Sequence, residues 1–304
     1  MNLEEIARLC HDITQSYLDI SEGVSPIIVE TQEAIKLSRK HIMEEIFNRW
    51  CPISGEISFS YNGGKDCQVL LLIYLGCLWK YYLDNKDKFN WDKFPLERLP
   101  TVFIASEETF TSLELFINSS VERYNLNLYK SQLDKTRKIS MAEAFDIFLK
   151  EYPITKSILI GVRRTDPFGE HLSPIQKTDL NWPSFVRLQP LLHWKLAHIW
   201  SFLLYSNEPI CGLYSVGFTS IGSISQTTPN PSLKKLTNSE DSKLSLSFDW
   251  EINNSYPNSM VKKSEVNISK LTDEDITLLS TFGEFHPGWY LIDDKLERSG
   301  RIKK

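Results

Sequence analysis

The stretch Ser60-Tyr61-Asn62-Gly63-Gly64-Lys65-Asp66-Cys67 lies between two apolar segments of different periodicity. Before it, Ile57–Ser60 alternates between apolar and polar residues and is rich in strand formers. After it, residues 68–82 place their apolar side chains on one broad helical face. The sequence therefore predicts a strand, a glycine turn and a helix N-terminus, an arrangement that typically binds anions through backbone N–H groups and the helix dipole.

Two charged residues follow the glycines of this turn. Lys65 would add a point charge for a phosphate, and Asp66, in the first helical turn, would offer a carboxylate oxygen to Mg²⁺. The turn is not a G-x-x-x-x-G-K-[ST] loop, because no glycine stands at the required offset and Asp follows the lysine. A tight turn with a solvated lysine explains the same residues equally well, so the motif alone leaves both interpretations open.

The composition is that of an ordinary globular protein: 304 residues, 41% hydrophobic and 24% charged, with a net charge of −5. The charge argues against general nucleic-acid binding, and five cysteines without a C-x-x-C pair argue against a disulfide framework or a structural zinc site. No apolar run approaches the ~20 residues of a membrane span, and the acidic first helix does not suit a signal peptide. We expect a cytoplasmic monomer with no nucleic-acid or membrane partner.

Strand and helix patterns alternate from residue 56 onwards, after helical patterns over residues 3–50 that break around Gly23–Pro26. The expected strands are 57–60, 101–105, 126–131 and 157–161, and the expected helices are 66–83, 109–124, 141–151 and 196–205. This alternation predicts an α/β fold with a mostly parallel, doubly wound sheet and helices on both faces.

We expect three parts: an N-terminal helical segment packed on the core (1–50), a nucleotide-binding α/β domain (51–226) and a C-terminal extension (227–304). Residues 163–182 contain Pro167, Gly169 and Pro174 and are expected to form a loop. Residues 227–270, rich in Ser, Asn, Thr and Lys, are expected to form a flexible surface insertion with short order around 244–252.

Ligands of such sheets bind at the carboxyl ends of the strands, which brings residues 60–66, 106–110 and 162–166 to one rim. There, Arg163 and Arg164 follow a buried strand and would clamp a phosphate, while Asp166 would share a metal ion with Asp66. A solvated loop, whose Asp-Pro pair only begins a turn, is the alternative interpretation.

A possible site for a planar heterocycle follows further along the chain. Asp179, Trp182 and Arg187 place an aromatic ring between a carboxylate and a guanidinium. For these residues alone, ordinary packing of the tryptophan beside a surface ion pair is the favoured interpretation.

Two further candidates are ambiguous. Glu107 would bind a metal or a ribose hydroxyl, although glutamate is also favoured in the first turn of a helix. Arg298 and Arg301 flank Ser299-Gly300 and would wrap an oxyanion, but acidic neighbours make a merely solubilising role the default for this pair alone.

These motifs occur together in one family, in the order glycine loop, Gly161–Pro167, Gln189–Trp194, Leu213–Gly222 and Glu297–Arg301. From about residue 50 to 302, the chain resembles the eukaryotic FAD synthetases of the fungal single-domain type. These enzymes are FMN adenylyltransferases of the phosphoadenylyl-sulfate (PAPS) reductase-like superfamily. The PAPS reductases carry a late catalytic cysteine, and no cysteine follows Cys211 here. The resemblance therefore excludes the reductase reaction.

The resemblance implies that the phosphate of FMN attacks the α-phosphorus of ATP in line, with Mg²⁺, to give FAD and diphosphate. The residues to which we assign catalysis are Asn62, Lys65, Asp66, Asp166, Arg298 and Arg301. ATP and its phosphates would be bound by Ser60, Tyr61, Asn62, Gly63, Gly64, Lys65, Ile104, Gly161, Val162 and Arg163. FMN would be bound by Glu107, Asp166, Asp179, Trp182, Arg187 and Arg298, and Mg²⁺ by Asp66 and Asp166.

Two other functions remain open at this point. One is a different PP-loop adenylyltransferase acting on RNA or on a small acid, although the acidic net charge and the missing C-x-x-C pair weigh against RNA. The other is a non-catalytic regulator that only binds a nucleotide.

Overall fold

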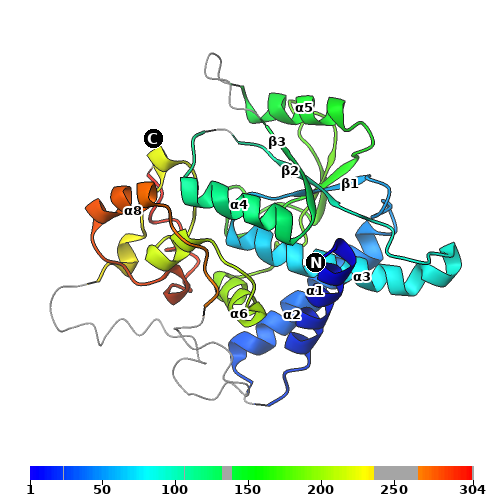
Figure 1. Cartoon of the computed structure of the whole chain (residues 1–304), viewed down its shortest axis with the longest axis horizontal. Coiled ribbons are helices and arrows are strands. Elements are labelled where there is room, and N and C mark those ends of the chain that lie inside the picture. Colours follow the sequence, from blue (N-terminus) through cyan, green and yellow to red (C-terminus); the bar gives the residue numbers. More distant parts are fainter. Residues whose placement is uncertain (23, 106, 132–138, 236–265, 303–304) are drawn as a thin grey trace.

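A six-stranded sheet of order β3-β2-β1-β4-β6-β5 forms the centre of the computed structural model, which describes residues 1–22, 24–105, 107–131, 139–235 and 266–302 (Figure 1). Every neighbouring pair is parallel except β5 with β6. The prediction of a mostly parallel α/β sheet is confirmed. The strands are β1 (Ile57–Ser60), β2 (Leu99–Phe103), β3 (Leu126–Lys130), β4 (Ser157–Leu159), β5 (Ile175–Lys177) and β6 (Val186–Leu188).

Helices cover both faces of this sheet (Figure 1). On one face lie α3 (Lys65–Phe89) and α4 (Thr111–Arg123), and on the other lies α5 (Met141–Glu151), whose Phe145 and Phe148 join a buried cluster with strand residues. The chain passes from β1 to β2 in one direction and returns to β4 on the other side of β1. The switch point of the sheet therefore lies between β1 and β4, where ligands of such folds bind.

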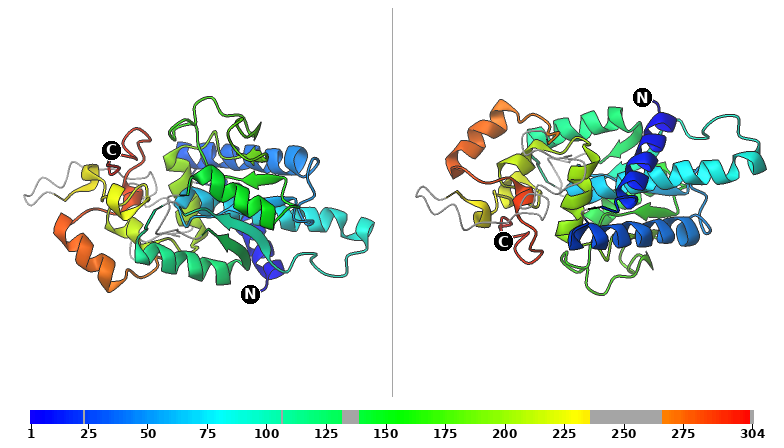
Figure 2. Two further views of the ribbon diagram at one scale, coloured as in Figure 1. Left: turned by 90° about the horizontal axis from the view of Figure 1, so that it is seen from above. Right: turned by 90° about the horizontal axis from the view of Figure 1, so that it is seen from below.

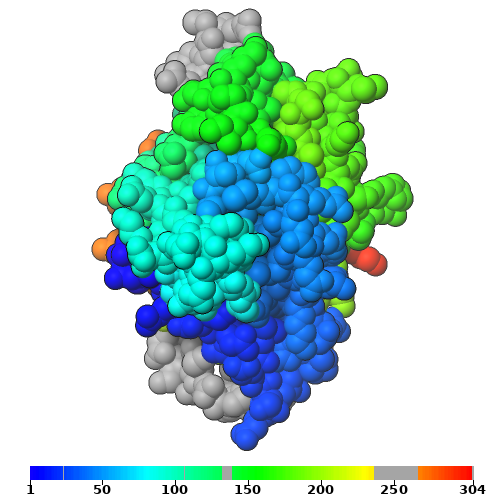
Figure 3. All heavy atoms as spheres, turned by 90° about the vertical axis from the view of Figure 1, so that its right-hand side faces the viewer, coloured from blue at the N-terminus to red at the C-terminus, as the bar shows by residue number. Residues whose placement is uncertain are grey.

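An outer layer of helices packs against α3: α1 (Leu3–Leu18), α2 (Pro26–Lys40) and α6 (Leu196–Ser206) (Figure 2). At Gly76 of α3, a Cβ would stand 3.2 Å from backbone atoms of Cys10 and His11, so the missing side chain allows α1 to lie close. One apolar cluster runs through these helices and the sheet. In Figure 3 the N-terminal helices and α3 form one continuous surface.

Two parts of the predicted secondary structure were wrong. Helix α3 continues past the expected end at residue 83 to Phe89. Residues 163–182 were expected to be loop, but β5 lies within them, and β6 follows close behind. Each of these strands has three residues, which is too short for an alternating pattern to stand out. The expected order around residues 244–252 lies outside the described residues.

Beyond α6, the described chain consists mainly of short helices that return to the rim of the sheet. Thr227 and Arg301 form an antiparallel bridge, and the N–H of Thr228 donates to the carbonyl of Gly300 at 2.9 Å. The Asp275 carboxylate accepts from the N–H of Ser112 at 2.7 Å, which caps the start of α4. These short elements are η2 (Gly212–Val216), η3 (Ile224–Gln226), η4 (Pro231–Leu233), α8 (Asp273–Leu279), η6 (Ser280–Phe282) and η7 (Gly288–Tyr290), while η1 (His41–Ile46) continues α2.

Among the residues placed by the structure, none belongs to a helix with the length and apolar character that crossing a bilayer requires.

Candidate active site

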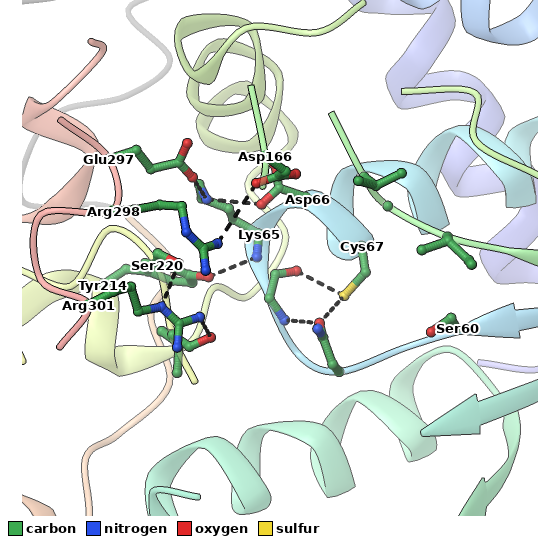
Figure 4. A pocket seen from close by; sticks show the side chains of 16 residues that line it. Ser60, Lys65, Asp66, Cys67, Asp166, Tyr214, Ser220, Glu297, Arg298 and Arg301 are labelled. Atoms are coloured by element: carbon green, nitrogen blue, oxygen red, sulfur yellow. Dashed lines mark hydrogen bonds and ion pairs between the residues drawn. The ribbon is translucent and has the colours of Figure 1, made fainter. Parts of the chain in front are cut away.

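A cavity of about 220 Å³ opens at the carboxyl ends of β1 and β4 (Figure 4). Its wall brings together ten of the residues that the sequence analysis assigned to phosphate, metal or catalysis: Ser60, Asn62, Gly64, Lys65, Asp66, Gly161, Val162, Asp166, Arg298 and Arg301. The wall also contains six residues with no assigned role: Cys67, Ile160, Tyr214, Ser220, Ile221 and Glu297. The rule that ligand groups gather at the carboxyl ends of strands thus brought residues from 60–66 and 162–166 to one cavity, whereas no described residue of 106–110 lines it.

The glycine turn presents open N–H groups to this cavity. Gly63 has φ +72°, and a Cβ there would stand 2.8 Å from the side chain of Leu113, so both conformation and space require glycine. Within the part of the chain that the structure describes, the N–H groups of Asp66 and Cys67 at the start of α3 have no hydrogen-bond acceptor. A Cβ at Gly161 would lie 2.9 Å from the Cys67 nitrogen, so its absence keeps this approach clear. The start of α3 is therefore suited to an anion.

Two of the side chains predicted to bind phosphate, Lys65 and Arg163, form ion pairs with carboxylates. The Lys65 ammonium is buried between Asp66, at 2.9 Å, and Glu297. The Arg163 guanidinium is fully buried and contacts Asp66 at 2.6 Å, Asp294 at 2.8 Å and also Glu297. Arg163 lies behind the cavity wall rather than on it. In this arrangement, both cations hold the acidic residues of the rim together, and direct contact with phosphate stays a prediction.

Arg298 and Arg301 carry the positive charge that faces the cavity. Among the described residues, Arg301 donates only to neutral groups: Ser220 Oγ at 3.0 Å, Thr227 Oγ1 at 3.0 Å and the Ile221 carbonyl at 2.7 Å. Burial, and then the charge of Arg298, lower the pKa of Arg301, as expected for a cation without a carboxylate partner. The exposed Arg298 approaches Asp166 only to 4.0 Å. Both guanidinium groups therefore retain charge that an anionic ligand would neutralise.

Gly222 leaves the space that the Arg301 side chain fills. A Cβ at this position would stand 1.6 Å from Nη1 of Arg301 and 2.6 Å from Cζ. Any other residue at position 222 would displace the guanidinium from its three acceptors.

Asp66 and Asp166 differ in their electrostatic surroundings. For Asp66, burial acts to raise the pKa, but Arg163 and Lys65 outweigh it and lower the pKa. For Asp166, burial and then the charge of Asp66 raise the pKa, although the Arg163 guanidinium and its N–H, which donates to Oδ2 at 2.9 Å, oppose this rise. A cation near Asp166 would relieve this repulsion.

The carboxylates of the cavity suit a metal ion that is shared with a ligand. The described residues contain no group of three or more His, Cys, Asp or Glu side chains arranged to hold a metal. Mg²⁺ is usually bound through one or two carboxylates together with substrate phosphates, so the pair Asp66 and Asp166 fits such an ion.

Four of the predicted ATP-binding residues do not reach the cavity wall: Arg163, Gly63, Tyr61 and Ile104. Tyr61 is fully buried, and its hydroxyl donates to Gln68 Oε1 at 2.8 Å. This hydrogen bond links the glycine turn to α3. Ile104 packs against the apolar cluster beneath α5.

Most of the predicted flavin-binding residues also lie elsewhere. Glu107 accepts from Gln226 Nε2 at 2.6 Å, which joins two loops of the rim. Asp179 pairs with Arg187 at 3.2 Å, and Trp182 packs on Phe145 with ring centroids 6.0 Å apart. The contacts of Asp179, Trp182 and Arg187 lie in and near the β5–β6 hairpin. The loop of this hairpin lies at the end of the sheet where the parallel strands begin, because Lys177 pairs with Val186, the first residue of β6. Their contact with a ligand stays a prediction.

The unassigned wall residues stabilise the glycine turn. The Tyr214 hydroxyl accepts from the N–H of Lys65 at 2.9 Å. Cys67 Sγ donates to Asn62 Oδ1 at 2.9 Å, and burial raises the pKa of this thiol to about 12, which makes it unsuited to nucleophilic chemistry. Tyr214, Ser220, Ile221 and Glu297 stand in motifs of the resemblance, but no periodic pattern marks them as wall residues.

Both the sequence and the structure are similar to characterised proteins over long stretches. Residues 56–229, more than half of the chain, match the phosphoadenosine phosphosulfate reductase domain family. The flavin adenine dinucleotide synthase of Saccharomyces cerevisiae is 54% identical over 310 aligned residues that cover all of both chains. A probable FAD synthase of Schizosaccharomyces pombe is 37% identical, covering 76% of this chain and 81% of that protein. The crystal structure of Candida glabrata FMN adenylyltransferase with FAD and inorganic pyrophosphate has a TM-score of 0.89 and 53% identity, covering 99% of this chain and all of the other.

Proposed function

The chain belongs to the FAD synthase family, within the proteins that carry a phosphoadenosine phosphosulfate reductase domain, and from this membership we propose that it is an FMN adenylyltransferase. It would join the adenylyl group of ATP to the phosphate of FMN and release diphosphate. The Candida glabrata relative was crystallised with FAD and inorganic pyrophosphate, the two products of this reaction.

One observation in the structure carries this proposal: the open N-terminus of α3 faces the same cavity as Arg298, which reaches Asp166 only at 4.0 Å, and Arg301, whose acceptors among the described residues are all neutral. ATP and FMN are both anions, so bringing them together requires positioning and neutralisation of charge more than acid–base chemistry. A phosphate nucleophile is already ionised at neutral pH, and no general base is needed.

Each part of the cavity has a distinct task in this reaction. The N–H groups of Asp66 and Cys67 would bind phosphate oxygens of ATP, and Arg298 and Arg301 would neutralise the charge that gathers as the two phosphates approach. Mg²⁺, held by Asp66 and Asp166, would supply further neutralisation of the phosphate oxygens when bound. Because Arg163 and Lys65 already pair with carboxylates, they would keep Asp66 ionised and in place.

The remaining assignments are part of the same proposal. The backbone of Gly161 and Val162, with Ile104, would flank the adenine, and Asp179, Trp182 and Arg187 would contact the isoalloxazine ring. Residues 51–226 would bind the nucleotide, and residues 227–304 would complete the active site through their two arginines. The protein would work as a cytoplasmic monomer.

The proposal is tested by incubating the purified protein with ATP, Mg²⁺ and FMN and separating the flavins by chromatography. We expect FAD and diphosphate in equal amounts, and no product when riboflavin replaces FMN, because riboflavin lacks the attacking phosphate. Asp66→Ala should lower turnover by orders of magnitude while the protein stays folded. Absence of FAD from the wild-type protein would overturn the proposal and favour a regulator or a different adenylyltransferase.

A further inference from the structure

The hydroxyl group of Tyr214 on the cavity wall carries a proton that no described residue accepts. Tyr214 lies in η2, is 2% exposed, and accepts the N–H of Lys65 at 2.9 Å on its hydroxyl oxygen. Figure 4 shows this contact between the Tyr214 hydroxyl and the start of α3. Among the residues that the structure describes, no group accepts the Tyr214 O–H proton. Buried donors in native proteins are rarely left unpaired, so a ligand is the natural acceptor.

The hydroxyl is held firmly and stays protonated. The ring packs edge-on against Trp200, with centroids 5.3 Å apart and planes at 82°. Burial, and then the negative charge of Asp66, raise the pKa of Tyr214 well above its usual value, although the Lys65 N–H opposes this. At neutral pH, Tyr214 is therefore a fixed neutral donor, not a base.

The position of this donor selects the chemistry of its ligand. The hydroxyl stands beside the first turn of α3, where the N–H groups of Asp66 and Cys67 are also open. Because its oxygen already accepts the Lys65 N–H, the hydroxyl proton is turned away from that group. Three convergent donors at a helix N-terminus suit the oxygens of a phosphate.

We propose that Tyr214 is a catalytic residue that donates a hydrogen bond to a phosphate oxygen of the nucleotide bound at the start of α3. This inference rests on the proposed function and adds a contact to it. Since the phenol is neutral, it binds the phosphate chain without adding positive charge, and release of diphosphate after the transfer is not slowed by a further ion pair. The binding of FMN does not involve this hydrogen bond.

The test compares Tyr214→Phe with Tyr74→Phe in steady-state FAD synthesis. Tyr74 is the matched control, because its hydroxyl is also buried but has no hydrogen-bond partner among the residues that the structure places and does not line the cavity. Loss of a hydrogen bond to a charged ligand should lower kcat/KM for ATP about 10- to 100-fold in Tyr214→Phe. The KM for FMN should change by less than about twofold, and Tyr74→Phe should match the wild type. Wild-type kcat/KM for ATP in Tyr214→Phe would overturn the proposal.

A second measurement separates donation to the ligand from support of the glycine turn. Site-specific replacement of Tyr214 by trifluorotyrosine lowers the pKa of the phenol, and the resulting phenolate still accepts the Lys65 N–H but cannot donate. We expect kcat/KM for ATP to fall at a lower pH than in the wild type. An unchanged pH profile would show that Tyr214 only supports the turn. If Tyr214→Phe does not fold, the protein with trifluorotyrosine at position 214 still tests the proposal.

Diphosphate binding makes this test independent of turnover. Calorimetric titration with inorganic diphosphate alone should give a dissociation constant about 10-fold or more higher for Tyr214→Phe than for the wild type. If the wild-type protein makes no FAD, the proposed function fails, but this titration still tests the hydrogen bond. Equal dissociation constants would overturn the role of Tyr214.

Discussion

Arg163 and Glu297 stand 134 residues apart in the sequence and form an ion pair in the interior of the protein. The other carboxylate oxygen of Glu297 accepts from the Lys65 ammonium. One carboxylate thus joins the chain after β4 to the start of α3. Because Arg298 follows directly and Arg301 is three residues further on, Glu297 also fixes the segment that brings both arginines to the cavity.

Glu297→Gln should weaken the fold, because both Lys65 and Arg163 lose a buried negative partner while the shape of the side chain is kept. We expect a loss of about 3–5 kcal/mol in the free energy of unfolding, measured by urea denaturation. Glu284→Gln is the control, since its pair with Lys235 at 3.3 Å is exposed and its removal should leave the transition unchanged. Equal effects of the two substitutions would show that the buried cluster does not stabilise the protein.

Gly222→Ala should displace Arg301 without removing its charge. The added Cβ overlaps only the end of a flexible side chain, so the unfolding transition should stay near that of the wild type. FAD formation should fall about 10- to 100-fold, because a shift of about 1 Å in a charged group is enough for such a loss. In an Arg301→Ala background, the same substitution should have little further effect on the rate. Additive losses would mean that Gly222 acts independently of Arg301.

Asp166→Asn should stabilise the protein at neutral pH while abolishing most of its activity. Since burial and Asp66 raise the pKa of Asp166 in the folded state, the folded protein holds this proton more tightly than the unfolded chain does. The wild-type free energy of unfolding therefore falls as pH rises from the ordinary Asp pKa of about 3.9 to the raised pKa of the folded state. The free energy of unfolding of Asp166→Asn does not fall in this pH range. The variant should therefore be more stable than the wild type at neutral pH but not in acid. Parallel curves of stability against pH for the two proteins would contradict the raised pKa.

Trp182→Ala should raise the KM for FMN more than the KM for ATP if the indole ring contacts the flavin. The alternative is that Trp182 only packs on Phe145, in which case the thermal unfolding midpoint falls and both KM values stay the same. Trp91→Ala, at a half-buried tryptophan after the end of α3, controls for the general loss of an aromatic side chain. Steady-state kinetics with each substrate varied in turn distinguishes these outcomes.

The sequence was informative where one segment carries its own signal. The change of periodicity across Ser60–Lys65 placed the end of β1 correctly and the start of α3 within one residue. The rule for parallel sheets then brought Asp66 and Asp166 to one cavity, because it depends on strand order and not on contacts.

Contacts between distant residues could not be predicted in the same way. Arg163 was expected to be a phosphate clamp, as its residue type suggests, and this role stays a prediction. Its partners Asp294 and Glu297, which lie more than 130 residues away, could not be predicted, nor could its complete burial. Tyr214 and Lys65 are 149 residues apart, and the local sequence around either residue does not predict their contact. The burial of a charged group depends on partners, and a single sequence does not record which partners meet.

The ion pair of Arg163 with Glu297 also sets an order of events during protein synthesis. A ribosome adds about 5–20 residues per second, so Glu297 emerges about 7–27 seconds after Arg163. All six strands are synthesised before the end of that interval, but the buried lysine and arginine do not yet have the carboxylate of Glu297. We therefore expect the nascent chain to form its sheet first and to acquire nucleotide affinity only after residues 294–301 have been added.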